Sequence, residues 1–317
     1  NPIRGSGGGT VTGRFSYSNP NLQQVPARNK ELGPMIRSLF LPERNHTWGC
    51  FDYSQQEPRL VVHYAASSSS ICKDESVVEI VDKFKDESVD FHQTVADMAN
   101  IERTQAKTIN LGLFYGMGKA KLQAELGLNT KQEAENLFDK YHESVPFVKD
   151  LMDKTSKKAS QDGYVRTLLR RRCNFPKWEV NEFRLGKLSV TGTRVETEAR
   201  FIENYKKKYP EADEEKINLI RKNLSSEDQD LIKRAFTYKA LNKLIQGSAA
   251  DMTKKAMLDL YKEGIVPHIQ IHDELDISVQ SKEQVNKIID IMENAVKLKV
   301  PNKVDYESGD NWGDIYD

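Results

Sequence analysis

Short strand-like segments at both ends of the chain, with helical segments between them, most constrain what this sequence can fold into. The run TWGCFDY at residues 47–53 is apolar and aromatic, and an acid stands near its end. Near the other end, HIQI and LDISV alternate as two strands around the acidic turn HDE at residues 272–274. The sequence therefore predicts an α/β fold of the α+β type, in which one discontinuous sheet domain carries an inserted helical lobe.

The region between these strand segments is predicted to be mainly helical. From about residue 75 to residue 160, apolar residues recur at helical spacing, and N-caps are expected at Asp74 and Asn129. From 177 to 236 the chain is highly charged and shows no clear repeats. We interpret this second stretch as a helical insertion.

Proline and glycine set the limits of two further helices. Pro58 is tolerated only in a first helical turn, where its missing N–H needs no partner, so its helix is expected to begin between Ser54 and Glu57. A long helix is expected over about 227–263. It should end at Gly264, because glycine readily adopts the left-handed conformation that terminates helices.

Composition excludes several classes of protein. The 317 residues exceed one average domain of about 150, so two lobes or one large lobe with insertions are expected. The 47 basic and 47 acidic side chains balance, and a nucleic-acid role must depend on local clusters such as Arg170–Arg172. Cys50, Cys72 and Cys173 fit neither a disulfide framework nor a zinc site, which favours a reducing compartment. The apolar stretches are shorter than the ~18 residues of a membrane helix, so no membrane partner is expected.

Two acids occupy positions typical of a metal site. Asp52 stands at the end of the first strand and Asp273 lies in the turn between the last two. Carboxylates from distant segments that meet at one sheet edge hold hard cations. Two Mg²⁺ ions about 3.5–4 Å apart would activate a hydroxyl nucleophile and stabilise a leaving pyrophosphate. The ordinary alternative is that Asp52 caps the next helix and Asp273 serves its turn, and spacing alone leaves both interpretations open.

The segment RTQAKTINLGLFYG presents one helical face of mixed chemistry. It spaces Arg103, Lys107, Leu111 and Tyr115 four residues apart, which places them along one side of a helix. A guanidinium fork and an ammonium point charge bind triphosphate oxygens, and an aromatic ring can stack on a base. The alternative is an amphipathic helix with a solvated basic edge.

Three longer motifs, in order, resemble family A DNA polymerases. FDYSQQEPR resembles the family's motif A, RTQAKTINLGLFYGMG its motif B and IQIHDELDIS its motif C. TGRFSYSNPNLQQVP resembles the primer-template contact segment, GYVRTLLRRR and ALNKLIQGSAADM resemble stretches between motifs B and C, and GDNW resembles the tail. The likeness covers nearly the whole chain except the region from about 177 to 236.

The resemblance implies a right-hand polymerase architecture. Its antiparallel palm sheet would come from residues 1–74 and 237–317, and a helical fingers lobe from 75–236, with the charged insertion at about 177–236. Nothing in the sequence resembles a nuclease, an exonuclease or a thumb. The first palm segment is therefore expected to begin almost at Asn1, and the glycine-rich opening suggests a piece of a longer protein.

The implied activity is template-directed addition of dNTPs to a primer 3′ end by two-metal-ion nucleotidyl transfer. Two Mg²⁺ ions, or Mn²⁺ in their place, would be the cofactors, and primer-template DNA and dNTPs the partners; no processivity partner is indicated. Asp52 and Asp273 would be the metal ligands, helped by the Tyr53 carbonyl, with Glu274 a weaker candidate. Glu57 would exclude a ribose 2′-hydroxyl. The expected location is the cytoplasm of a bacterial or phage-infected cell.

The resemblance also implies two sets of contacts, and it makes Lys107 the proton donor to the leaving pyrophosphate. The dNTP would be bound by Arg103, Lys107, His92, Glu57, Leu111, Tyr115 and Gln55. The primer-template would be contacted by Arg14, Asn21, Gln23, Asn242, Gln246 and His272. Several of these contacts would lie in the minor groove, where acceptors common to all base pairs allow shape to be checked without a sequence preference. Without the motifs, turn, cap and solvated-surface roles would be the ordinary interpretation of the amides and histidines.

The chain departs from the family pattern in the fingers. Pro58 follows the motif A glutamate in place of an aliphatic residue, and the run from His92 to Lys107 is shorter than in bacterial DNA polymerase I. The charged insertion is longer, so a reshaped fingers lobe is expected. Leu111 stands where most members have phenylalanine or tyrosine, which puts in doubt any sugar discrimination carried over from them.

Two rival functions remain beside DNA synthesis. A single-subunit RNA polymerase would share the two aspartates and the helix that runs from Lys107 to Tyr115 and Gly116. Glu57 and the TGR segment at residues 12–14 argue against it. A catalytically weak fragment that binds primer-template DNA is the other rival, because without a thumb the grip on the duplex phosphates is reduced.

Overall fold

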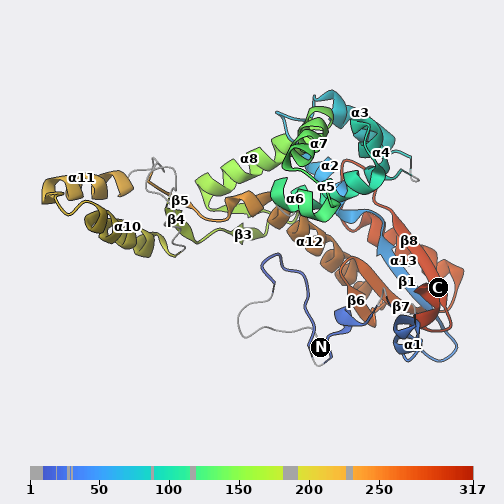
Figure 1. The fold of residues 1–317 in the computed structure, drawn as a ribbon. Helices are drawn as coiled ribbons and strands as arrows, with labels where there is room; N and C mark the ends of the chain where they lie inside the picture. Colours follow the sequence, from blue (N-terminus) through green and yellow to red (C-terminus); the bar gives the residue numbers. More distant parts are fainter. Residues whose placement is uncertain are drawn as a thin grey trace. The chain divides into compact units, whose positions relative to one another are not determined.

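A computed structural model gives the fold of the chain (Figure 1). It describes residues 10–18, 20–26, 29, 31–86, 89–114, 119–180, 192–225 and 231–316. The chain divides into two compact units. The first comprises residues 1–151, 166–171 and 242–317, and the second comprises residues 152–165 and 172–241.

The first unit is built around a four-stranded antiparallel sheet with the order β6-β7-β1-β8. Its strands are β1 (Thr47–Tyr53), β6 (Ile269–Ile271), β7 (Glu274–Val279) and β8 (Val304–Gly309). Figure 1 shows the blue β1 among strands coloured as the C-terminal part of the chain. The predicted sheet, assembled from both ends of the sequence, is therefore confirmed, and with it the α+β class.

The two faces of this sheet differ in chemistry because neighbouring side chains in a strand point to opposite faces. Cys50 pairs in register with Asp276, and Asp52 pairs with Glu274, so these polar side chains share one face. On the other face, the Tyr53 hydroxyl donates to the Met292 carbonyl at 2.6 Å, which packs this face against α13 (Lys282–Asn294). The acids therefore gather on the face away from α13.

The first unit contains further helices, some of them inside the predicted helical region from about 75 to 160 and some outside it. They are η1 (Leu22–Gln24), α1 (Leu32–Arg37), α2 (Gln56–Ala66), α3 (Glu75–Lys83), α4 (Phe91–Ala99), α5 (Arg103–Phe114), α6 (Lys119–Leu126), α7 (Lys131–Ser144) and η3 (Trp312–Tyr316). Two helices run from one unit into the other, α8 (Pro146–Asp162) and α12 (Ala240–Lys262). Among the described residues, no helix combines the length and the apolar character needed to cross a membrane.

Two of the three helix starts and caps predicted in the first unit agree with the structure. Helix α2 begins within the predicted range and holds Pro58 in its first turn, and Asp74 caps α3 by accepting a bond from the Ser76 N–H at 2.9 Å. The expected cap at Asn129 is wrong. Thr130 instead accepts from the Glu133 N–H at 3.2 Å, while the Asn129 N–H donates to the Glu133 carboxylate at 3.1 Å. The Thr130 side chain therefore caps α7, one residue later than expected, and the Glu133 carboxylate binds the N–H of the residue before the cap.

The second unit has its own core. It contains β2 (Tyr164–Arg166, whose last residue belongs to the first unit), β3 (Arg172–Asn174), β4 (Trp178–Val180), α10 (Arg194–Lys208), α11 (Glu214–Ser225), β5 (Ile232–Arg234) and η2 (Thr237–Lys239). Trp178, Phe201, Ile217, Leu224 and Ile232 form a buried cluster. The charged insertion is thus a small packed body of helices and a strand pair.

One predicted helix limit in this region is wrong. The helix expected from about 227 begins only at Ala240. Residues 232–234 form β5, in which Arg234 pairs in register with Trp178. The Arg234 side chain donates to the Ser160 carbonyl at 3.1 Å and its guanidinium lies 4.6 Å from the Trp178 ring centroid. These tertiary contacts outweigh the local helical pattern, which is a weak preference by itself.

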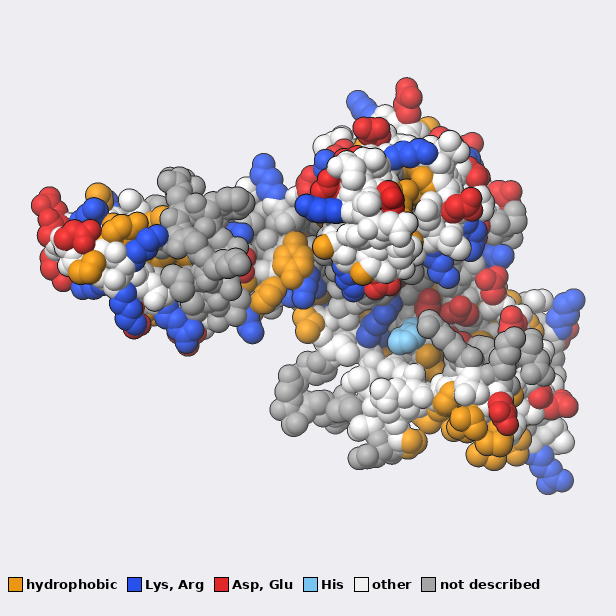
Figure 2. Space-filling view, in the orientation of Figure 1, with side chains coloured by type: hydrophobic (Ala, Val, Ile, Leu, Met, Phe, Trp, Pro, Cys, Tyr) orange, Lys and Arg blue, Asp and Glu red, His pale blue; other side chains and the backbone are white. Residues whose placement is uncertain are grey.

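The high charge of the insertion is explained by ion pairs along its helices. Arg194 pairs with Glu198 at 2.8 Å and Lys207 with Glu203 at 2.7 Å, both one helical turn apart. Figure 2 shows basic and acidic side chains interspersed over α10 and α11. Such pairs between solvated side chains each contribute little to the stability of a helix.

Candidate active site

The fold brings the two predicted metal-binding acids together. Asp52 lies opposite Glu274 in the register of β1 and β7, and the Tyr53 N–H donates to the Asp273 carbonyl at 3.4 Å. Asp52, Tyr53 and Asp273 therefore share one end of the two adjacent strands. Both aspartates are partly exposed, so an ion can reach them.

Burial and like charges both act on these carboxyl groups. Burial, followed by the charges of Asp273, Glu274 and Asp305, raises the pKa of Asp52 to about 8. Burial also raises the pKa of Asp273, and the Arg14 charge opposes that rise. Without a cation the cluster holds protons that ordinary aspartates release.

The donor set fits a hard divalent cation. Carboxylate oxygens and a backbone carbonyl are the ligands that Mg²⁺ takes in proteins. A bound divalent charge would also offset the neighbouring acidic charges that add to burial in raising the pKa values of Asp52 and Asp273.

The raised pKa of Asp52 predicts the pH dependence of stability in the metal-free protein. The folded state binds more protons than the unfolded chain between the unfolded pKa of about 4 and the folded pKa of about 8. The free energy of unfolding should therefore fall as the pH rises through this window. Thermal unfolding in EDTA should show a Tm that decreases with pH in the wild type and decreases less in Asp52→Asn. Equal slopes in the two proteins would contradict this account.

Glu57 and Arg14 form an ion pair beside these acids. The Arg14 Nη2 atom lies 2.5 Å from Glu57 Oε1. Burial raises the pKa of Glu57, the Arg14 charge lowers it, and the Asp273 charge raises it again. The first turn of α2 thus holds the predicted sugar-excluding carboxylate close to Asp273, with a predicted primer-template contact as its counter-ion.

Gln55 joins this region to the start of α4. It has a positive φ of 53°, and its side-chain amide donates to the Val89 carbonyl and accepts from the Phe91 N–H, each at 2.7 Å. Both ends of the amide are engaged with the backbone. Gln55 would therefore contribute to nucleotide binding mainly by holding in place the helix that carries His92.

Asp90 organises the predicted triphosphate contacts. It caps α4 by accepting from the His92 N–H at 2.8 Å, and its other oxygen accepts from Arg103 Nε and Nη2 at 2.9 and 2.6 Å. Exposed Lys107 lies one helical turn beyond Arg103 on α5. Arg103 and Lys107 therefore both lie near the start of α4, where their charges act on His92.

His92 is uncharged at neutral pH in this setting. The pKa of His92 is lowered to about 4, chiefly by burial; the Lys107 and Arg103 charges act in the same direction and the Asp90 charge opposes them. Its Nδ1 atom lies 3.1 Å from the Asn110 side-chain nitrogen. Because that amide donates, Nδ1 accepts and Nε2 carries the proton, so the ring offers one N–H donor.

The remaining predicted residues of motif B are only partly covered by the structure. Leu111 lies in α5, one turn after Lys107. Its side chain, and Tyr115 entirely, lie outside the described residues.

The predicted primer-template residues fall on three segments of the first unit. Asn21 caps η1 by accepting from the Gln23 N–H at 3.2 Å, and the Gln23 amide donates to the Phe15 carbonyl at 3.3 Å. His272 is exposed in the β6–β7 turn, where its φ is 53°. Within the protein, Asn21 and Gln23 therefore stabilise a turn, and His272 occupies one.

Asn242 and Gln246 lie one turn apart near the start of α12. The Asn242 side-chain nitrogen is buried, and within the described part of the chain it has no hydrogen-bond partner. A buried donor without a partner is costly.

A family model described as DNA polymerase family A matches residues 6–314. The chain belongs to DNA polymerase family A. It is 34% identical to the DNA-directed DNA polymerase of Pseudomonas phage M6, over 96% of this chain and 44% of that protein. It is also 34% identical to DNA polymerase I of Bacillus subtilis, over 96% of this chain and 30% of that protein.

A solved structure has the same fold. The POL domain of Pol1 from M. smegmatis, in complex with DNA primer-template and dNTP, superposes with a TM-score of 0.68 at 25% sequence identity. The match covers 97% of this chain and 47% of that one. The chain thus spans less than half the length of these relatives.

Sequence reasoning named Glu274 as a weaker metal-site candidate but missed the group of polar residues around it on the family A sheet. Cys50, Glu274 and Asp276 bring possible ligand atoms within 4.8 Å of one another. Asp276 is fully buried and accepts a bond from Trp48 Nε1 at 3.0 Å. Burial, followed by the Glu274 charge, raises the pKa of both Cys50 and Asp276. The alternation of LDISV was the available signal, since it places Asp276 on the same face as Glu274.

The Arg170–Arg172 cluster is also divided by the fold. Arg171 binds Asp251 at 3.0 Å, whereas the Arg172 guanidinium lies 4.6 Å from the Tyr164 ring centroid. These neighbouring arginines therefore serve different parts of the protein instead of forming a single basic patch.

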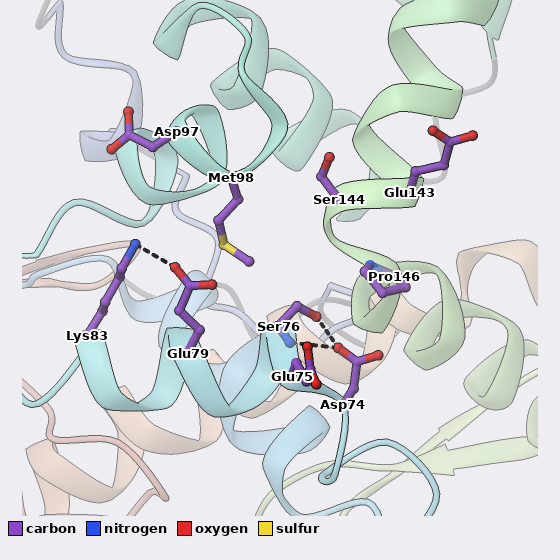
Figure 3. A pocket seen from close by; sticks show the side chains of 10 residues that line it. All are labelled: Asp74, Glu75, Ser76, Glu79, Lys83, Asp97, Met98, Glu143, Ser144 and Pro146. Atoms are coloured by element: carbon purple, nitrogen blue, oxygen red, sulfur yellow. Dashed lines mark hydrogen bonds and ion pairs between the residues drawn. The ribbon is translucent and has the colours of Figure 1, made fainter.

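A separate acidic pocket of about 610 Å³ lies in the first unit (Figure 3). It is lined by Asp74, Glu75, Ser76, Glu79, Lys83, Asp97, Met98, Glu143, Ser144 and Pro146. Figure 3 shows Asp74 bound to Ser76 and Glu79 paired with Lys83. Its described lining contains no predicted site residue, and these two acids serve a helix cap and a surface ion pair.

Proposed function

We propose that this family A chain adds dNTPs to a primer 3′ end under the direction of a template, by two-metal-ion nucleotidyl transfer. The observation that carries the proposal is the meeting of Asp52 and Asp273 at one end of β1 and β7, with Glu57 near Asp273. Membership of the family and the primer-template and dNTP bound to the M. smegmatis relative support it.

The chain's own residues divide the work. Asp52, Asp273 and the Tyr53 carbonyl would hold two Mg²⁺ ions, which when bound supply activation of the primer hydroxyl and neutralise phosphate charge. Lys107 is exposed and would give its proton to the leaving pyrophosphate. Arg103 would bind phosphate oxygens with the fork that now holds Asp90.

Three further groups would select and position the substrates. His92 would donate from Nε2 to a phosphate oxygen as a neutral ring, and Glu57 would occupy the space of a ribose 2′-hydroxyl. Arg14 and Asn242, with the other predicted contacts, would test the shape of the primer-template minor groove.

We assign the palm to residues 1–74 and 237–317 and the fingers to 75–236. A cytoplasmic location remains a prediction of the sequence.

Primer extension with Mg²⁺ at low salt tests the proposal and separates its rivals. A family A DNA polymerase should extend with dNTPs and reject rNTPs, and an RNA polymerase should prefer rNTPs. A weak binding fragment should retain primer-template DNA without extending it. Binding without extension at saturating dNTP would overturn the proposed activity.

Leu111 provides a prediction about the nucleotide sugar. It lies one turn from Lys107 on α5 and should face the sugar, where an aliphatic side chain offers packing but no hydroxyl. If the site relies on the nucleotide's own 3′-hydroxyl, a ddNTP lacks a polar contact that nothing replaces. Leu111→Tyr should therefore raise ddNTP use relative to dNTP use, measured by single-nucleotide extension.

Leu111→Phe is the matched control because it adds the ring without the hydroxyl. It should change the ddNTP/dNTP ratio much less than Leu111→Tyr. If Leu111 only fills the fingers core, both variants should behave alike and lose stability through overpacking. Equal ratios in the three proteins would remove Leu111 from the sugar pocket.

A further inference from the structure

One arginine ties the segment that carries Arg14 to α12. We call this segment, residues 10–17, the strap. Arg171 Nη2 donates to the Thr12 carbonyl at 2.7 Å and to the Gly247 carbonyl of α12 at 2.9 Å. Arg171 Nε donates to Asp251 Oδ1 at 3.0 Å. Three directed bonds from one guanidinium thus connect strap and helix.

The loop that carries this arginine is itself fixed to α12. The Leu169 N–H donates to Asp251 Oδ2 at 3.3 Å, and the Leu168 N–H donates to Ser248 Oγ at 3.1 Å. Ser248 Oγ also lies 2.7 Å from the Tyr64 hydroxyl of α2. Asp251, only 7% exposed, therefore binds both the side chain of the arginine and the backbone of its loop.

The strap fits closely against these groups. Gly13 has a φ of +85°, and a Cβ at this position would lie 2.9 Å from the Arg171 guanidinium. Lys254 Nζ donates to the Gly13 carbonyl at 2.6 Å and lies 4.5 Å from the Phe15 ring centroid. Both neighbours of Arg14 in the chain are thus held from α12 or its attached loop.

Arg14 is the residue between these two anchored positions. Its side chain forms an ion pair with Glu57, which lies on α2. We propose that Arg171 and Asp251 are positioning residues for the Arg14–Glu57 pair, so that discrimination between dNTPs and rNTPs depends on them. This inference rests on the proposed function. The physical reason is that a carboxylate excludes a hydroxyl only while its counter-ion and backbone hold it within a fraction of an ångström.

Arg171→Lys tests the proposal, because a lysine is a point charge that cannot reproduce the fork of directed bonds. The ratio of kcat/KM for rNTP to that for dNTP should rise about tenfold, with kcat for dNTP changed less. Hydrogen exchange should become faster in the strap. Asp251→Asn should act in the same direction.

A double substitution separates positioning from general destabilisation. If Arg171 acts through Glu57, Arg171→Lys should add nothing to the ratio in a Glu57→Ala background, whereas independent effects would add. Tyr64→Phe is the stability control. It removes one bond to Ser248 of α12 but leaves the bonds of Arg171 to Asp251 and to the strap in place, so it should lower Tm while leaving the ratio unchanged.

The outcomes are distinguishable. A wild type that binds primer-template DNA without extending it overturns the proposed function and this inference together. An active wild type whose ratio is unchanged in Arg171→Lys overturns the inference alone, even where strap exchange becomes faster. A ratio that shifts as much in Tyr64→Phe, at equal loss of Tm, also overturns it.

Discussion

Asp273→Asn should lower magnesium-dependent primer extension by about three orders of magnitude or more, measured as kcat/KM for a matched dNTP. The reason is the shared position of Asp273 and Asp52 at one end of adjacent strands. An amide keeps the size of the side chain but not its negative charge, so it binds a hard cation poorly. Asp52→Asn should have the same effect because the two acids would share the same ions.

Asp305→Asn is the matched control for this loss. Asp305 pairs in register with Asp52 across β1 and β8, and its charge contributes to the raised pKa of Asp52. It is exposed and paired with Lys303 at 3.2 Å, so extension should stay within about fivefold of the wild type. Asp52→Asn removes a carboxyl group that the folded, metal-free protein must keep protonated, so it should leave folding intact and raise Tm in EDTA at neutral pH. Normal magnesium-dependent extension by Asp273→Asn would remove it from the metal site.

Glu57→Ala should raise incorporation of rNTPs relative to dNTPs by roughly 100-fold. Glu57 lies in the first turn of α2, and its carboxylate is bound by Arg14 at 2.5 Å and lies near Asp273. Truncation to alanine opens the space that a 2′-hydroxyl needs. The measurement is the ratio of kcat/KM values for matched rNTP and dNTP, because discrimination is a difference between transition-state free energies.

Glu57→Gln separates shape from charge. It keeps the volume of the side chain while weakening the bond to Arg14, so it should raise the ratio much less than Glu57→Ala. An unchanged ratio in Glu57→Ala would show that another group excludes the ribose hydroxyl. Equal ratios in the two variants would show that the charge of Glu57, and not its volume, carries the discrimination.

Elements whose signals are local were predictable from the sequence. Alternation placed β6 and β7 around an acidic turn, and Pro58 fixed the start of α2 within a few residues. Gly264 ends α12 in the left-handed conformation, with a φ of +76°. Such features depend on backbone geometry and nearest neighbours, which a short run of sequence contains.

Beyond the sheet itself, which side chains find one another across the fold was not predictable. Residues 232–234 had a helical pattern, yet they pair with β4, because Arg234 and Ile232 find their partners in the core of the second unit. Arg171 was grouped with its basic neighbours, although its bonds go to Asp251 and to the strap. No local pattern identifies a partner that lies about 80 residues away.

For the candidate site, the sequence by itself determined the two acids, the helix face of Arg103 and Lys107, and the sheet that joins both ends of the chain. The tertiary structure alone decided that Asp52 lies beside Asp273, that Arg14 neutralises Glu57, and that Asp90 binds Arg103. The reason is physical. Residue type and spacing set what a side chain can bind, whereas burial and proximity across the fold set which group it binds and which of the two carries the proton.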